Sequence, residues 1–407
     1  MMSQLTWLAF SLIPKEMAPI YGFTDLTSIY FLTLSQPLVF IILSIPIGVL
    51  ADRKGLMIVA GTGSVIVTVF AALRIFLIDN FLMIFICQIG LSVGAVLIQD
   101  CITYLSVHWF PRVERTLATG VSTVFQLLGM LIGSTMSLFL WVPPFAGQSG
   151  FTAAGAESNI LSILTIQTIL SVIFMIVFFL VARDRPKLPP EIEEVSTKKP
   201  NITRLLRDRS PWIISYGFFV GFAIIIGLTG ILEPLLTSPS IGAVETPGIS
   251  NPIVITQTLI LAFGIIGAFI VSAISDKVQR RKPFLLLALL IGAVTTFLLG
   301  TSPFSILTYL VAAVLGFFLI SVMPVALTTM EELKCCGPQL SGASAGLAFE
   351  FGNLGGFLGL LIMSYVLYNP VTDSFFYSIL FLSVLTLIST ALVLLIPETG
   401  RREKSKD

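Results

Sequence analysis

Charged residues are scarce in this chain. Only 11% of its 407 residues are Asp, Glu, Lys or Arg, whereas 56% are hydrophobic. Soluble domains carry about 25% charged residues, so these few charges cannot cover the surface of a soluble protein of this size. The net charge is only +1, and without a basic excess we expect no nucleic-acid partner.

Histidine and cysteine are also rare. The chain has one histidine and four cysteines, and no cysteine pair has the spacing of a zinc site. We therefore expect neither a metal nor a disulfide framework. HExxH and Walker sequences are missing, which argues against a metalloprotease-type enzyme, an ATP-driven pump and a bound cofactor.

The apolar residues form long blocks. Block after block reaches the roughly 20 residues that a helix needs to cross the hydrocarbon of a bilayer. The sequence therefore predicts an all-α membrane protein with twelve transmembrane helices, over residues 3–21, 27–50, 57–77, 80–107, 114–141, 159–182, 211–236, 252–275, 283–300, 304–330, 341–368 and 374–396.

Basic residues gather on one side of these spans. Of the 23 Lys and Arg residues, 21 lie at the ends of even-numbered spans, and only Lys15 and Arg74 lie elsewhere. Short cytoplasmic loops carry the excess of Lys and Arg in membrane proteins. We therefore expect these loops and both termini in the cytoplasm, and, without an organelle signal, a multi-pass protein of the plasma membrane.

The two halves of the chain resemble each other. Asp276 follows span eight as Asp52 follows span two, and Ser344-Ala345-Gly346 in span eleven repeats Ala118-Thr119-Gly120 in span five. Both repeats occur at nearly the same offset along the chain, which indicates a duplicated architecture. We predict an N-terminal six-helix bundle (1–182), a cytoplasmic linker (183–210), a C-terminal six-helix bundle (211–396) and a cytoplasmic tail (397–407).

The segment after span two, GVLADRKG (48–55), resembles the signature of the major facilitator superfamily. The resemblance implies two pseudo-symmetric six-helix bundles in one monomer, and secondary transport by alternating access. In physical terms, Asp52 at the membrane edge can bond with a helix N-terminus and with Arg53 or Arg115. Together with Asp276, these residues are predicted to form a cytoplasmic lock that is made in one conformation and broken in the other.

A narrower resemblance extends from Met1 to about Met130. WFPRVERTLATGV (109–121), GLMIVAGTGSVIVTVFAALR (55–74) and the surroundings of Trp7 are similar to the feline leukemia virus subgroup C receptor-related family. Its members are associated with choline and ethanolamine transport and with heme export. The resemblance implies substrate binding by Trp7, with Gln126 and Asn353 at or beside polar positions of the family, whereas Ile224 replaces a tyrosine of its choline-binding members.

Three ionisable residues lie inside predicted spans, where such groups are costly and often functional. Asp100 is either a proton carrier, a counter-ion for a cationic substrate, or a structural partner of Arg74. Glu350 is either a proton-coupling carboxyl or a group satisfied by a neighbouring helix. Arg74 either binds an anionic substrate or pairs with Asp79 or Asp100, and we favour the pair.

These observations predict a secondary transporter for a small organic solute, with a choline-like amine as the first candidate and protons as the candidate coupling ion. A cation or zwitterion would fit the face of Trp7, whereas an anion would use Arg74. The alternatives are an organic-anion or drug exporter of the same fold and a membrane receptor that does not transport.

Overall fold

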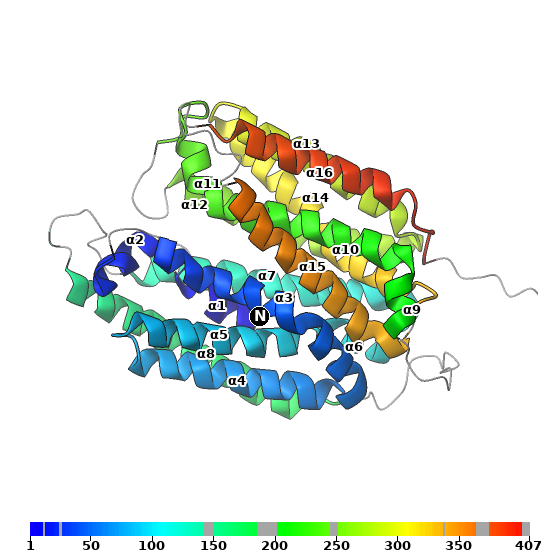
Figure 1. The fold of residues 1–407 in the computed structure, drawn as a ribbon, viewed down its shortest axis with the longest axis horizontal. Coiled ribbons are helices and arrows are strands. Elements are labelled where there is room, and N and C mark those ends of the chain that lie inside the picture. Colours follow the sequence, from blue (N-terminus) through cyan, green and yellow to red (C-terminus); the bar gives the residue numbers. More distant parts are fainter. Residues whose placement is uncertain are drawn as a thin grey trace, which may run out of the picture.

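The computed structural model describes residues 1–10, 13–23, 27–141, 150, 152–184, 202–244, 251–336, 338–363 and 374–400. These residues form long helices that lie side by side in one elongated bundle (Figure 1). Residues 185–201 of the predicted linker (183–210) and residues 401–407 of the predicted tail (397–407) lie outside the described residues. The division into four segments therefore stays a prediction.

Helices between Met1 and Asp184 lie together in the lower half of Figure 1. The chain begins with a broken segment made of α1 (Met2–Trp7), η1 (Leu8–Phe10), α2 (Pro14–Met17) and η2 (Ala18–Tyr21). It continues with α3 (Thr27–Lys54), α4 (Leu56–Phe76), α5 (Phe81–Gln99), α6 (Cys101–Trp109), η3 (Arg112–Glu114), α7 (Arg115–Leu140) and α8 (Ala153–Val181).

Helices from Ile202 onward lie mostly in the upper half of Figure 1, where α15 runs diagonally down toward α6. They begin with α9 (Ile202–Arg207), α10 (Arg209–Phe222), the π-helical turn η4 (Ala223–Gly227) and α11 (Leu228–Thr237). The remaining elements are α12 (Pro252–Val278), α13 (Lys282–Thr301), α14 (Ile306–Glu331), η6 (Pro338–Leu340), α15 (Ser341–Leu361) and α16 (Phe376–Val393).

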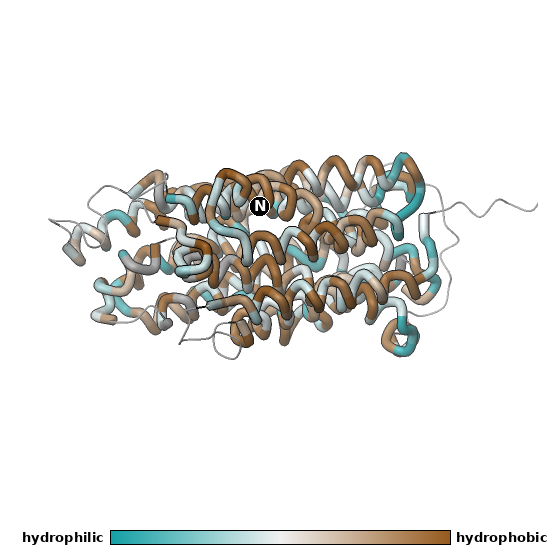
Figure 2. The backbone as a smooth tube through the Cα atoms, turned by 90° about the horizontal axis from the view of Figure 1, so that it is seen from above, coloured by the Kyte–Doolittle hydropathy of each residue, from teal (hydrophilic) through white to brown (hydrophobic). Residues whose placement is uncertain are grey.

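Ten helical stretches of the described chain are long and apolar enough to cross a membrane. α4, with 21 residues, is about 32 Å long at 1.5 Å per residue, close to the roughly 30 Å of hydrocarbon. Figure 2 shows apolar residues along the bundle and polar residues at its ends. α15 is not among the ten, because its glycines, Glu350 and Asn353 lower its hydropathy, and the first segment is broken. The count of twelve spans therefore stays a prediction.

Three spans that we expected to be single helices are interrupted. In the first span, α1 ends at Trp7 and gives way to the 3₁₀ turn Leu8–Phe10, and a separate helix, α2, begins at Pro14, a residue that disfavours continuation of a preceding helix. In the fourth span, α5 ends at Gln99 and α6 starts at Cys101. In the seventh, the π turn Ala223–Gly227 separates α10 from α11. Apolar block length predicts that a segment crosses the membrane, but it does not show these breaks.

The two halves touch closely at the charged end of the bundle, where α3 packs along α15. A Cβ atom added at Gly48 would collide with the carbonyl group of Gly342, and one added at Gly342 would lie 3.0 Å from Asp52 Oδ1. Glycine at both positions therefore lets two helix backbones meet without side chains between them. This close approach brings Asp52 to the first turn of α15.

Candidate functional site

A cavity lies between the two halves, near the middle of the bundle. α1, α3, α5 and α7 line it from the first half, and α10, η4, α14 and α15 line it from the second. Such a position allows one bound molecule to contact both halves.

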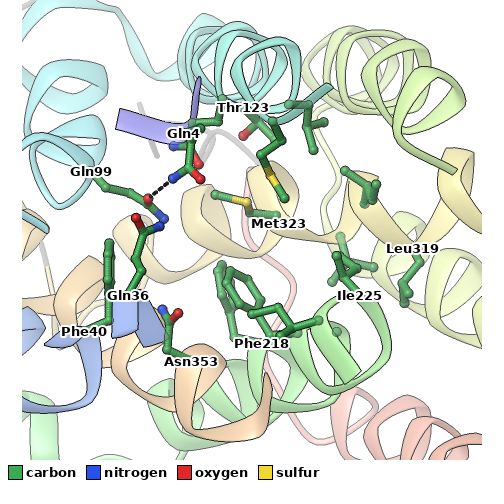
Figure 3. Close-up of a pocket in the computed structure, with 18 of the residues that line it drawn as sticks. Gln4, Gln36, Phe40, Gln99, Thr123, Phe218, Ile225, Leu319, Met323 and Asn353 are labelled. Carbon is green, nitrogen blue, oxygen red and sulfur yellow. Dashed lines mark hydrogen bonds between the residues drawn. The ribbon is translucent and has the colours of Figure 1, made fainter. Parts of the chain in front are cut away.

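One side of the cavity is polar and uncharged. It carries the side chains of Gln4, Gln36, Gln99, Thr123 and Gln126, all from the first half. Figure 3 shows Gln4 and Gln99 joined by a hydrogen bond and Gln36 beside them. Gln4 Nε2 donates to Gln99 Oε1 over 2.9 Å. Within the described part of the chain, Gln4 Oε1 and Gln126 Nε2 are buried without a hydrogen-bond partner, so both are available to a ligand.

The opposite side is apolar and partly aromatic. Phe218 and Phe222 of α10 line it, together with Ile225 of η4 and Leu319 and Met323 of α14 (Figure 3). Among the described lining residues there is no Asp, Glu, Lys or Arg. The cavity therefore presents amides on one side and aromatic and aliphatic groups on the other.

Trp7 is held tightly at the edge of this cavity. Its indole Nε1 donates to the carbonyl oxygen of Thr33 in α3 over 2.8 Å, and its own carbonyl oxygen accepts from Gln88 Nε2 of α5 over 3.0 Å. Only 6% of the side chain is exposed. Trp7 thus lines the cavity in one fixed orientation, with its N–H group already occupied.

The structure places three of the four predicted substrate-binding residues on the cavity. Trp7, Gln126 and Asn353 line it, and Asn353 Nδ2 donates to the carbonyl oxygen of Phe349 within α15 over 2.8 Å. The fourth residue, Asp100, is not among the lining residues. Instead its neighbour Gln99 reaches the cavity, because successive helical residues point in different directions around the helix axis.

Sequence reasoning missed the glutamine cluster of Gln4, Gln36 and Gln99. A signal was present for Gln4, which lies three residues before Trp7 and so shares its side of a helix. Gln99 carried no signal beyond its place next to Asp100. Gln36 carried no signal of its own, because a single amide in an apolar span is as often a helix-packing contact.

Asp100 lies at the junction of α5 and α6 and is fully buried. Neither of its carboxyl oxygens has a hydrogen-bond partner among the described residues. The charge of Glu350 on α15, in the other half, acts on Asp100. Two carboxylates within electrostatic reach repel each other when both are ionised.

Arg74 does not form the ion pair that we expected with Asp79 or Asp100. It is fully buried, and its hydrogen bonds go to neutral groups instead. Nη1 donates to the carbonyl oxygen of Thr6 over 3.0 Å and to Gln88 Oε1 over 3.3 Å, and Nη2 donates to Gln167 Oε1 over 3.4 Å. The break in the first helix leaves carbonyl groups that Arg74 can reach, and Arg74 is not among the cavity-lining residues.

Asp52 joins the two halves at the charged end of the bundle. Its carboxylate accepts hydrogen bonds from the backbone N–H groups of Gly342 (2.7 Å) and Ala343 (2.9 Å) and from the hydroxyl of Ser341 (3.3 Å). These groups form the first turn of α15, where a negative charge is favoured by the helix dipole. The predicted contact with a helix N-terminus is present. The hydrogen bonds recorded for Asp52 come from this turn rather than from Arg53 or Arg115.

Asp276 makes the equivalent contact from the second half. Its Oδ2 accepts a hydrogen bond of 2.6 Å from the backbone N–H of Leu117, in the first turn of α7, and its Oδ1 lies 2.8 Å from Arg281 Nη1. Each half therefore contributes one aspartate to the N-terminus of a helix in the other half. This pseudo-symmetric pair joins the two halves at the same end of the bundle.

The other two predicted lock residues lie near this contact. Arg53 is exposed. Arg115 is buried at the start of α7, where its guanidinium donates to the carbonyl oxygens of Val107 and Phe110 over 3.4 Å each. Its charge also acts on Glu331 at the end of α14, and Glu331 accepts a hydrogen bond of 3.2 Å from Ser106. Arg115 thus lies within the closed interface, and Arg53 at its rim.

Comparison with known proteins agrees with this geometry. The chain is 24% identical over 361 residues to the choline/ethanolamine transporter flvcr2b of Danio rerio, covering 84% of this chain and 70% of that protein. It is 24% identical to solute carrier family 49 member A3 of Xenopus tropicalis, covering 63% of this chain and 51% of that protein. An uncharacterized protein of Archaeoglobus fulgidus is 28% identical over 192 residues, 47% of this chain and 82% of that protein.

Solved structures show the same fold. The transporter FucP in its outward conformation matches with a TM-score of 0.70 at 13% sequence identity, over 97% of this chain and 96% of that one. The family model of the Major Facilitator Superfamily matches residues 1–360. These matches confirm the predicted fold, the narrower resemblance and the interpretation of the chain as a transporter rather than an enzyme. The chain belongs to the major facilitator superfamily of membrane transporters.

Proposed function

We propose that this transporter carries a choline-like amine, and that the cavity between its halves is the substrate site. The observation that carries the proposal is the lining of the cavity, which sets Trp7 and free amide groups against an aromatic wall and presents no charged side chain among the described residues. Aromatic faces attract quaternary and primary ammonium groups, and the oxygen of Gln4 can accept from a substrate hydroxyl. The name of the Danio rerio relative, a choline/ethanolamine transporter, supports the same substrate class.

The aromatic wall offsets one departure from the choline-binding pattern. Ile224 replaces the tyrosine of the choline-binding relatives and is not among the cavity-lining residues. Phe218 and Phe222, earlier in the same span, do line the cavity, and Figure 3 shows Phe218 across from Gln4 and Gln99. An aromatic surface for a cation is therefore provided by other positions of this helix.

Proton coupling is the second part of the proposal. Asp100 and Glu350 belong to different halves, and Asp100 lies one residue beyond the cavity-lining Gln99. A buried carboxyl group without a partner is a site where a membrane transporter can accept and release a proton. We infer that protonation of this pair is tied to the relative movement of the two halves.

The lock completes the proposed cycle. We infer that Asp52 and Asp276, with Arg53 and Arg115 beside them, close the cytoplasmic side while the substrate site is open to the outside. The basic residues at this end support the cytoplasmic assignment through the positive-inside rule. We propose a monomer in the plasma membrane with both termini in the cytoplasm, two six-helix bundles at 1–182 and 211–396, a linker at 183–210 and a tail at 397–407.

Uptake by proteoliposomes tests the proposal. The purified protein is reconstituted, and uptake of labelled choline and ethanolamine is measured with and without an inward proton gradient. We expect saturable uptake that the gradient stimulates and that Trp7→Ala abolishes. Failure to transport or bind either amine under any gradient would refute the substrate proposal. The anion alternative receives no support from the cavity, because Arg74 does not line it.

A further inference from the structure

Arg74 has a role that the proposed transport cycle leaves unassigned. It is a fully buried cation whose described partners are all neutral. A cation inside a membrane protein is costly, so a buried arginine indicates a specific structural or functional need. The contacts of Arg74 identify that need.

The break in the first helix creates a need for hydrogen-bond donors. α1 ends at Trp7 and is followed by the 3₁₀ turn η1, so the carbonyl groups of its last residues lose the regular i→i+4 bonding of an α-helix and can accept further hydrogen bonds. No water is available in the hydrocarbon to replace them. Arg74 donates to the carbonyl oxygen of Thr6, and Gln88 donates to that of Trp7. Arg74 also donates to Gln88 Oε1, which orients the amide toward Trp7.

Trp7 is thereby fixed from three helices of the first half. α4 provides Arg74, α5 provides Gln88, and α3 provides the carbonyl of Thr33 that accepts from the indole. We propose that Arg74 is a positioning residue that acts through Gln88 and the end of α1 to hold the Trp7 ring at the substrate cavity. It does not bind the substrate itself.

An arginine suits this role better than a neutral donor. Its planar guanidinium has five N–H groups in a fixed arrangement, and here two of its nitrogens serve Thr6, Gln88 and Gln167 together. The carbonyl end of a helix favours a positive charge. The ring of Phe10, whose centroid lies 5.6 Å from the guanidinium carbon, adds a further attraction. These contacts compensate the buried charge without an acidic partner.

Fluorescence of Trp7 tests the positioning directly and needs no substrate. Trp109, Trp141 and Trp212 are replaced by Phe, so that Trp7 is the only tryptophan left. In this background, Arg74→Met should shift the emission maximum and increase acrylamide quenching at least about twofold. Arg74→Lys should restore part of the parent signal, because an ammonium group still donates to a carbonyl oxygen.

Gln167 provides the matched control. Gln167→Leu removes one hydrogen bond of Arg74 to α8 but leaves both carbonyl groups of α1 satisfied, so the Trp7 signal should stay unchanged. Gln88→Met removes the donor to the Trp7 carbonyl while keeping the buried charge, and should reproduce the change. If Arg74→Met does not fold, Gln88→Met decides. A Trp7 signal that is equal in Gln88→Met and the parent, or equally altered in Gln167→Leu, would overturn the proposal.

A double-mutant cycle of Arg74 and Trp7 then tests whether the position of the Trp7 ring matters for choline binding. This second measurement rests on the proposed function. Arg74→Met should weaken choline binding about tenfold in the parent, and not at all when Trp7 is already Ala, because residues that act through one another are not additive. An equal loss in both backgrounds would show that Arg74 contacts the substrate. If the parent binds no choline, the proposed substrate fails, while the fluorescence result still decides the role of Arg74.

Discussion

Neutralising Asp52 should unlock the closed end of the transporter. In Asp52→Asn the side chain keeps one acceptor oxygen but loses its charge, and an amide NH₂ group faces at least one of the backbone donors of α15. Hydrogen bonds to a charged group contribute about 1.5–3 kcal/mol and neutral ones about 0.5–1.5 kcal/mol. Asp52 is only partly buried, so we take a net loss of about 2 kcal/mol. This corresponds to a roughly 30-fold larger population that is open at this end.

Accessibility of the cavity from each side measures this shift. Thr123, which lines the cavity, is replaced by Cys in a variant without the four native cysteines, and the rate of labelling by a membrane-impermeant maleimide is followed. In inside-out vesicles, Asp52→Asn should raise the labelling rate by about the same 30-fold factor while the open state is rare. Asp276→Asn should act in the same direction, because its carboxylate holds the first turn of α7.

Asp184 provides the control for this experiment. Its carboxylate accepts a hydrogen bond of 2.7 Å from the backbone N–H of Met57, at the start of α4. This is again an aspartate at a helix N-terminus, but both groups belong to the first half. Asp184→Asn should therefore leave the labelling rate unchanged. If Asp52→Asn labels like the parent, or Asp184→Asn labels like Asp52→Asn, these contacts do not form the lock.

Three further predictions follow from the site. Asp100→Asn and Glu350→Gln should each abolish uptake driven by a proton gradient but preserve choline exchange across liposomes without a gradient. Gln99→Leu should weaken choline binding about tenfold, in the range expected for a lost polar contact. Gln257 on α12 lies outside the cavity, so Gln257→Leu should leave binding unchanged. Isothermal titration calorimetry measures the affinity of both variants. Gly342→Val should prevent closure by separating α3 from α15, and so match Asp52→Asn in maleimide labelling without any change in charge.

The closed end of the transporter was predictable because it depends on repeated short sequences. Asp52 and Asp276 follow equivalent spans, and the ATG and SAG segments lie three residues after the starts of the helices that receive them. Local sequence alone places an aspartate at the end of one helix and small residues at the start of another. The partner of each aspartate could only be named as a helix N-terminus, because which helix it meets depends on how the halves pack.

The cavity was less predictable, since it depends on where helices break. Trp7, Gln126 and Asn353 were expected from family resemblance, whereas Gln4 and Gln99 reach the cavity because α1 and α5 end beside it. Apolar block length carries no information on such breaks. Arg74 was assigned an acidic partner for the same reason, because the free carbonyl groups that it satisfies exist only once the first helix is broken.

The lock and the cavity differ in symmetry, and this difference has a mechanistic consequence. Each half gives one aspartate to the lock, but five of the six polar residues that line the cavity, all except Asn353, come from the first half. The second half contributes mainly apolar and aromatic side chains, whose contacts with a ligand are less directional than the hydrogen bonds of the amides. A substrate should therefore stay bound to the first half while the second half moves over it. Exchanges of cavity residues in α1, α3 and α5 should then alter substrate choice, and exchanges in α10 and α14 should mainly alter the rate of transport.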